Sequence, residues 1–201
     1  MKLSFHLNGT PVALDTAPDR RALDVLREDL RALPGHGHTA RGAGEADEGR
    51  AALDVKEGCG TGECGVCSIL VDGEHKLACL MLAAQLEGRR VTTAAGLGAP
   101  GRPHAVQRAF AEMGAVQCGF CTPGMEIAAA ALLARNPAPT RAEARRALSG
   151  NLCRCTGYVK IVDAVLAAAA MLRAERAAPC ETYESGEACE SGEAGAGEGG
   201  K

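Results

Sequence analysis

Alternating apolar and polar residues open the chain, and the dipeptide Asn8-Gly9 interrupts the alternation. Asn-Gly is a typical two-residue turn between antiparallel strands. Because a period of two buries one face of a strand, residues 1–15 are predicted to form a β-hairpin. The apolar positions of this hairpin are Leu3, Phe5, Leu7, Val12 and Leu14.

The apolar spacing then changes to three and four residues, at Leu23, Leu26 and Leu30. This spacing predicts a helix, with Asp19 as its N-cap and Pro34-Gly35 closing it.

Residues 34–54 show no apolar period and are predicted to be a loop. His36 and His38 lie in this loop without a cysteine or carboxylate beside them at ligand spacing. We therefore interpret them as solvated side chains and not as metal ligands.

A second hairpin is predicted at residues 68–78, where Asp72-Gly73 is a turn signal between two short strands. A short helical piece at residues 80–86 and a last strand at residues 91–93 follow it. We assign these elements and the first hairpin to one domain, residues 1–95. Residues 96–103, with three Gly and two Pro, are the predicted linker.

Residues 104–176 are predicted to form four helices. Thr122-Pro123 is a typical helix start, Asn136-Pro137 a helix end, and Thr140-x-x-Glu143 a capping box. Residues 177–201 are rich in Gly, Glu, Ala and Ser, and are predicted to be a disordered acidic tail.

The charge balance excludes some classes of partner. The net charge is −3, and the tail from residue 177 contributes six Glu and one Lys, or −5, so the remainder carries +2. Such a balance argues against a nucleic-acid partner. The sequence shows neither a signal peptide nor an apolar run of membrane-span length, so a cytoplasmic location without a membrane span is expected.

Ten cysteines in a chain without an export signal favour metal binding over disulfides. Eight of them form two groups, with the spacings C-x4-C-x2-C-x11-C and C-x2-C-x31-C-x-C. Cys180 and Cys189 remain over in the tail and are interpreted as spare thiols. The first group is Cys59, Cys64, Cys67 and Cys79, and the second is Cys118, Cys121, Cys153 and Cys155.

The opening of the first group is the plant-type ferredoxin spacing for a [2Fe–2S] cluster. Glycines between its cysteines allow backbone N–H groups to crowd around sulfur. The second group could by its spacing hold either zinc or a [2Fe–2S] cluster. Each of its cysteine pairs precedes a predicted helix, so two helix N-termini would face one anionic centre. No nucleophile–base arrangement is evident, and we assign no catalytic residue to this chain.

The runs VKEGCGTGECGVCSILVDG, AVQCGFCTPGM and NLCRCTGY closely resemble the iron–sulfur subunit of the xanthine oxidase family of molybdenum hydroxylases. The resemblance implies an α+β chain, in which a β-grasp, plant-type ferredoxin-like domain precedes an all-α four-helix bundle. It implies one [2Fe–2S] cluster in each domain. It also implies a large partner subunit that binds molybdopterin and a medium partner subunit that binds FAD, assembled as a dimer of heterotrimers.

The resemblance further implies that electrons pass from molybdenum to the second cysteine group, then to the first group and to FAD. Gln117 matches the position that hydrogen-bonds the pterin, and Cys155 the position whose sulfur approaches the pterin amino group. Residues 34–54 and the acidic tail depart from the family pattern. Two alternatives remain open: a free-standing two-cluster electron carrier, and a structural zinc-binding adaptor.

Overall fold

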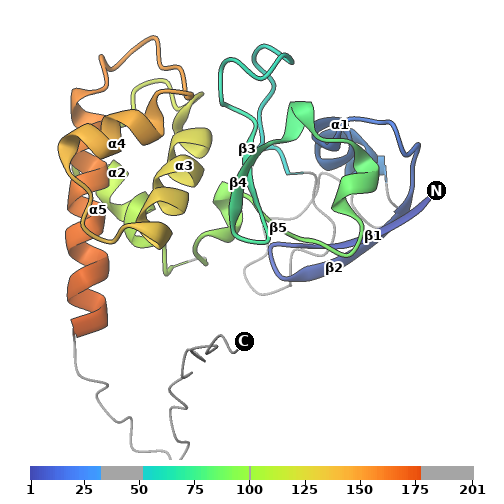
Figure 1. Cartoon of the computed structure of the whole chain (residues 1–201), viewed down its shortest axis with the longest axis horizontal. Coiled ribbons are helices and arrows are strands. Elements are labelled where there is room, and N and C mark those ends of the chain that lie inside the picture. The colour runs from blue at the N-terminus through green and yellow to red at the C-terminus, as the bar shows by residue number, and fades with distance from the viewer. Residues whose placement is uncertain (33–51, 100, 178–201) are drawn as a thin grey trace, which may run out of the picture.

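The computed structural model describes residues 1–32, 52–99 and 101–177, and it contains a sheet at one side and helices at the other (Figure 1). Five strands form one mixed sheet in the order β2-β1-β5-β3-β4. The strands are β1 (Lys2–Leu7), β2 (Thr10–Asp15), β3 (Ser68–Val71), β4 (Glu74–Leu77) and β5 (Arg90–Thr92).

Both predicted hairpins are present. Asn8 and Gly9 have φ values of 52° and 87°, which suit the tight turn between β1 and β2, and Asp72 and Gly73 do the same at 51° and 84°. The return strand β4 begins directly after the second turn, two residues before its predicted start. β1 pairs with β5 in parallel, which joins the N-terminal strand to the far end of this half of the chain.

The first helix begins later than predicted. α1 (Ala22–Asp24) continues as a π-helical turn (Val25–Asp29) and a 3₁₀ turn (Leu30–Ala32), and its N-cap is Arg21. The assignment of Asp19 as N-cap is therefore wrong. Backbone bonds from Ala83 N–H to the Arg20 carbonyl and from Ala22 N–H to the Met81 carbonyl hold the preceding segment extended. The predicted helix end at residues 34–35 lies outside the described residues.

The predicted helical piece at residues 80–86 is two 3₁₀ turns, at Ala78–Leu80 and Ala83–Leu86, and a third lies at Ala94–Gly96. The four helices predicted beyond residue 104 are present: α2 (Ala105–Glu112), α3 (Thr122–Arg135), α4 (Arg141–Leu148) and α5 (Val159–Ala177).

The boundary signals of α3 and α4 largely hold. Thr140 and Glu143 form the predicted capping box of α4. The N-cap of α3 is Cys121 and not Thr122, so the helix begins one residue earlier than predicted. Cys121 already has helical backbone angles (φ −80°, ψ −16°). Thr122 is therefore the first residue inside the helix and not its N-cap.

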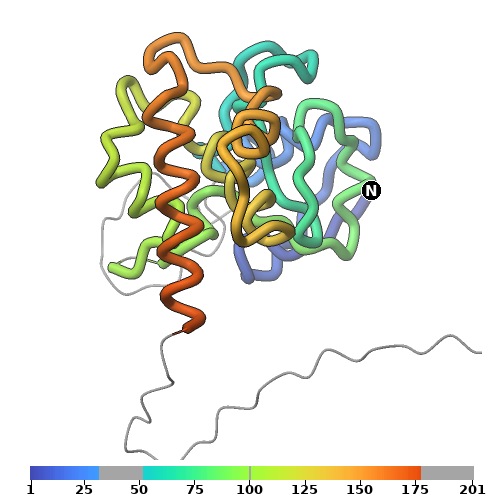
Figure 2. The backbone as a smooth tube through the Cα atoms, turned by 60° about the vertical axis from the view of Figure 1, so that its left-hand side comes forward, coloured from blue at the N-terminus to red at the C-terminus, as the bar shows by residue number. Residues whose placement is uncertain are grey.

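Two hydrophobic clusters fill the molecule. One lies under the sheet and includes Leu3, Phe5 and Leu26, and the other lies among α2 to α5 and includes Phe110 and Met125. α5 runs along the outside of the helical half and packs against α2 (Figure 2). Within the described residues, no helix is both long and apolar enough for a membrane crossing. Most of the predicted 34–54 loop and nearly all of the 177–201 tail lie outside those residues.

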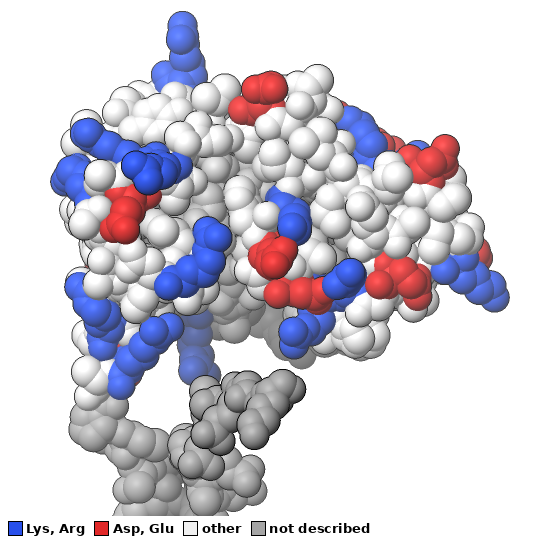
Figure 3. Space-filling model, viewed as in Figure 1, with Lys and Arg blue, Asp and Glu red and all other residues white. Residues whose placement is uncertain are grey.

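Acidic and basic side chains both occur on the face shown in Figure 3. Lys and Arg gather over the helical half, where α4 alone carries Arg141, Arg145 and Arg146. Over the sheet the two signs are mixed, with pairs such as Arg89–Asp72.

Candidate metal centres

The first three cysteines of the first group lie on one glycine-rich loop. Gly60, Gly62 and Gly65 have φ values of 68°, 84° and 72°, which a residue with a Cβ rarely adopts. The loop turns the backbone N–H groups of Thr61 and Glu63 toward the Cys59 sulfur, at 3.4 and 3.3 Å. Hydrogen bonds, chiefly from Thr61, lower the pKa of the Cys59 thiol to about 6. The loop thus favours a thiolate at Cys59.

The β3–β4 hairpin returns the fourth cysteine to this loop, as its sequence predicts. Cys67 and Cys79 are both buried and interact through their sulfurs, and burial raises the pKa of the Cys67 thiol to about 12. Space behind the loop is tight, since a Cβ at Gly58 would lie 2.8 Å from the Cys64 sulfur. In the first group Cys67 and Cys79 are therefore buried and Cys64 is partly buried, while Cys59 is exposed.

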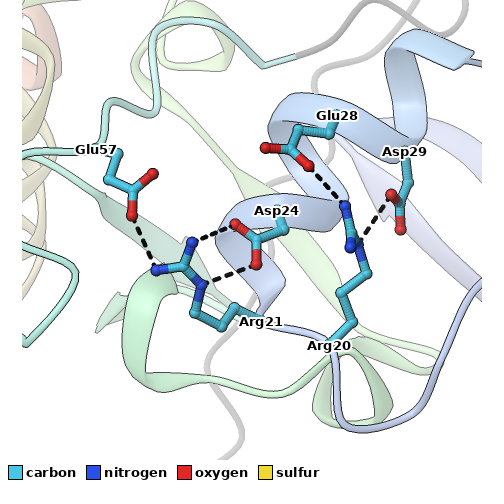
Figure 4. Close-up of polar contacts among 6 residues, drawn as sticks. All are labelled: Arg20, Arg21, Asp24, Glu28, Asp29 and Glu57. Atoms are coloured by element: carbon cyan, nitrogen blue, oxygen red, sulfur yellow. Dashed lines mark hydrogen bonds and ion pairs between the residues drawn. The ribbon is translucent and has the colours of Figure 1, made fainter.

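Arg21 braces the start of the first cysteine loop (Figure 4). Its guanidinium holds Asp24 through two hydrogen bonds of 2.8 and 2.6 Å, and it bonds Glu57 at 2.9 Å. Arg20, the preceding residue, points elsewhere and pairs with Glu28 and Asp29. One arginine thus ties the α1 segment to the loop that begins at Cys59, and its neighbour does not.

The second cysteine group lies where two helices begin. Cys118 and Cys121 precede α3, and Cys153 and Cys155 precede α5, as the sequence predicts. The turn before α5 is fixed by Tyr158, which has a φ of 68°, and its hydroxyl accepts from the Cys153 N–H at 2.8 Å. The Cys118 and Cys155 sulfurs lie 3.6 Å apart.

The sulfurs of Cys118 and Cys155 form a close pair, and the other cysteines of each group interact two by two. Two thiolates on one tetrahedral metal, with metal–sulfur bonds of about 2.3 Å, lie roughly 3.8 Å apart, which is near the 3.6 Å between Cys118 and Cys155. Within the described parts of the chain, no three His, Cys, Asp or Glu side chains are arranged around a point that suits a single metal ion. Pairs fit a [2Fe–2S] cluster, in which each iron takes two of four thiolates. The pairs are Cys59–Cys64, Cys67–Cys79, Cys118–Cys155 and Cys121–Cys153.

The two cysteine groups are joined by hydrogen bonds. Leu152 N–H, next to Cys153, donates to the Cys64 carbonyl oxygen at 2.9 Å. Beside it the buried Asn151 amide donates to the Gly65 carbonyl oxygen at 2.9 Å. Backbones meet closely here, since a Cβ at Gly124 of α3 would lie 2.5 Å from the Gly65 oxygen. The sheet half and the helical half thus contact each other at their cysteine loops.

The outer end of the second group lies on an apolar surface. Cys118 and Cys155 are exposed, and Gln117 beside them is exposed as well. Large apolar side chains flank them along the chain, and each leaves about half of its area exposed: Val116, Phe120, Leu152 and Val159. Near the first group the Leu80 side chain is 63% exposed, and it lies against Gly62. Exposed apolar area of this kind is typical of surfaces that contact other proteins.

Three residues of this region were not singled out from the sequence. Lys56 stands three residues before Cys59, and Asn151 stands two residues before Cys153. Their proximity to cysteines was the only signal, and their partners lie in the other half of the chain. Arg21 gave no signal, because Glu57 is 36 residues away in the sequence.

This chain is similar in sequence and in structure to known iron–sulfur proteins. Residues 93–166 match the family described as "[2Fe-2S] binding domain". The nicotinate dehydrogenase small FeS subunit of Eubacterium barkeri is 44% identical over 81% of this chain and 91% of its own length. The xanthine dehydrogenase iron-sulfur-binding subunit of Escherichia coli is 43% identical over 80% of this chain and 89% of its own length. A solved chain of quinoline 2-oxidoreductase from Pseudomonas putida superimposes with a TM-score of 0.71 at 39% identity, covering 87% of this chain and 96% of that one.

Proposed function

Because the chain belongs to the iron–sulfur subunits of the xanthine oxidase family of molybdenum hydroxylases, we propose that it relays electrons from a molybdopterin-binding large subunit to an FAD-binding medium subunit. It is a subunit of an oxidoreductase, and substrate chemistry takes place on a partner chain. Two [2Fe–2S] clusters, when bound, supply one-electron redox chemistry.

The eight paired cysteines are the proposed ligands. Cys59, Cys64, Cys67 and Cys79 hold the first cluster, and Cys118, Cys121, Cys153 and Cys155 hold the second. The N–H groups that point at the Cys59 sulfur stabilise the first set of thiolates, as do the N-termini of α3 and α5 for the second.

The observation that supports an electron relay is the arrangement of the two cysteine groups. They are joined to each other by a backbone hydrogen bond, and each group has exposed cysteines away from that bond. The contact is the hydrogen bond between Leu152 and Cys64, while Cys118, Cys155 and Cys59 are exposed. The family resemblance gives the direction of this relay: electrons enter at the Cys118–Cys155 end, where Gln117 and Cys155 contact the pterin of the large subunit. They leave at the Cys59 end toward the medium subunit. The apolar residues flanking each end support contact with a partner there.

The finer architecture follows the same proposal. Residues 1–95 form a β-grasp, plant-type ferredoxin-like domain with an insertion at 34–54, residues 96–103 a linker and residues 104–176 a four-helix bundle. The acidic tail predicted for residues 177–201 lies, apart from Ala177 at the end of α5, outside the described residues. The mixed sheet order and the two separate hydrophobic clusters support this division. The assembly is a cytoplasmic dimer of heterotrimers.

The test is to purify the chain with its partners and to count metals and spins. The dithionite-reduced complex should give two distinct rhombic EPR signals, with about four iron atoms and four acid-labile sulfides per chain. Zinc without sulfide would overturn the proposal in favour of a structural adaptor. A chain that purifies alone, without a flavin- or molybdenum-containing partner, would favour a free-standing carrier.

A cysteine variant separates the two sites. Cys155→Ser should alter the EPR signal of the second cluster and slow electron flow to the flavin, while the signal of the first cluster persists. Cys180→Ser is the control, because that cysteine is interpreted as a spare thiol, and both signals should be unchanged. Loss of both signals in the Cys155 variant would contradict two separate sites.

A further inference from the structure

Lys56 connects the segment before the first cysteine group to a loop of the second group. Its ammonium donates a 2.7 Å hydrogen bond to the Gly119 carbonyl oxygen, between Cys118 and Cys121. The same ammonium lies 5.2 Å from the centre of the Phe120 ring, a distance typical of a cation–π contact. These two contacts hold the positive charge of Lys56 against the loop that carries Cys118.

The peptide group between Gly119 and Phe120 interacts at both ends. Its oxygen accepts from Lys56, and its N–H, on Phe120, faces the Cys118 sulfur two residues earlier in the chain. Hydrogen bonds in a chain polarise one another, so an ammonium on the oxygen strengthens the N–H donor at the other end. The charge of Lys56 therefore acts on the Cys118 sulfur through one peptide group.

The described residues offer Lys56 no carboxylate at ion-pair distance. Its backbone N–H bonds the Val66 carbonyl oxygen at 3.3 Å, which anchors it in the first cysteine loop. The charge is thus carried by the sheet half and presented to the helical half. It reaches Gly119 only while the two halves are docked as described.

A [2Fe–2S] cluster gains one negative charge when it accepts one electron. A positive charge nearby, or a stronger hydrogen bond to a ligand sulfur, stabilises the reduced form more than the oxidised form. We propose that Lys56 is a positioning residue that raises the reduction potential of the second [2Fe–2S] cluster through the Gly119–Phe120 peptide. This proposal rests on the proposed function, since it requires Cys118 to be a cluster ligand.

The experiment is a potentiometric titration of the purified complex in which each cluster is followed by its EPR signal. Lys56→Met should shift the midpoint of the second cluster to a more negative potential, and shift that of the first cluster less. Lys56→Gln keeps a neutral donor for Gly119 and should give a smaller shift of the same sign. Lys56→Arg keeps the charge and should stay close to the unchanged protein.

Lys76→Met is the matched control. Lys76 lies on β4, three residues before Cys79, but its charge is paired with Glu74 at 2.8 Å, and no contact to the loop of Cys118 and Cys121 is present among the described residues, so the second midpoint should not move. If Lys56→Met does not take up both clusters, the comparison of Lys56→Gln with Lys56→Arg carries the test.

An unchanged second midpoint in every variant that folds would overturn the proposal. An equal or larger shift in the midpoint potential of the first cluster would also overturn it. That result would mean that the substitution disturbs the structure around both clusters. If the unchanged complex lacks two [2Fe–2S] signals, the proposed function itself fails.

Discussion

The Leu152 N–H donates a 2.9 Å hydrogen bond to the carbonyl oxygen of Cys64. Cys153 follows Leu152 in the chain, so one hydrogen bond and a short run of covalent bonds connect a cysteine of each group. The bond belongs to the backbone, and the Leu152 side chain is 56% exposed beside it. The backbone of Leu152 thus connects the two cysteine groups, and the Leu152 side chain stays exposed to solvent.

Asn151→Ala should weaken this junction. The buried Asn151 amide is a donor to the Gly65 carbonyl oxygen, which would lose that partner inside the protein. We expect the free energy of unfolding to fall by about 2 kcal/mol, as measured by urea titration. Asn136→Ala is the control, since its bond with the Ala138 N–H is exposed, and it should cost about 1 kcal/mol or less. Equal losses in the two variants would mean that Asn151 adds nothing to the junction.

Gly65→Ala should separate the two halves of the molecule. A Cβ at this position would collide with the Gly150 carbonyl oxygen, and Gly65 has a φ of 72°. Gly73 has a similar φ of 84° with open space around its Cβ position, so Gly73→Ala measures the backbone strain alone. We expect a loss of about 1 kcal/mol for Gly73→Ala and at least about 3 kcal/mol for Gly65→Ala. Thermal midpoints check this, and similar midpoints would contradict the close backbone contact.

Glu126 should make the stability depend on pH. Burial, and then the nearby charge of Asp54, raise the pKa of this carboxyl from its usual 4.5 to about 7. The folded state therefore holds the proton more tightly than the unfolded state. Stability is full below about pH 4.5 and falls, by at most roughly 3 kcal/mol, as the pH rises through 7.

The Glu126→Gln variant should flatten this dependence, which thermal midpoints between pH 5 and 8 would reveal. Glu112→Gln, a change at an exposed position of α2, serves as the control and should keep the slope of the unchanged protein. A Glu126→Gln protein with that same slope would refute the assignment.

Arg21→Ala should destabilise the first metal site selectively. Arg21 links Asp24 to Glu57, and Glu57 lies two residues before Cys59. We expect its removal to cost about 1–2 kcal/mol and to speed the loss of the first EPR signal in the presence of a chelator. Arg20→Ala removes an arginine of similar exposure that pairs with Glu28 and Asp29, so it should leave that rate unchanged. Equal rates for the two variants would contradict a brace at Arg21.

Local signals predicted much of the fold. The turns at Asn8-Gly9 and Asp72-Gly73, the capping box at Thr140 and the four helices all follow from short stretches of sequence, because the deciding interactions lie within a few residues. Asp19 failed as an N-cap because pairing with the segment around Met81 decides where that helix begins. The residues around Asp19 do not reveal that the segment near Met81, about sixty residues away, pairs with them.

The spacing of the cysteines assigned Cys118, Cys121, Cys153 and Cys155 to one group, but it did not predict what joins the two groups. Asn151 and Lys56 act across the junction, on Gly65 and Gly119. Both are ordinary polar residues in sequence, and only the docking of the two halves gives them their partners. The assignment of all eight ligands remains a prediction for the EPR and metal analyses to test.

The parallel pairing of β1 with β5 constrains the order of folding during synthesis. His6 lies opposite Arg90, so the central strands of the sheet cannot join before about ninety residues have left the ribosome. The β3–β4 hairpin that carries Cys67 and Cys79 together can form earlier, because its contacts are local. The Cys67 and Cys79 thiols can therefore come together through local contacts before the central strands of the sheet have paired.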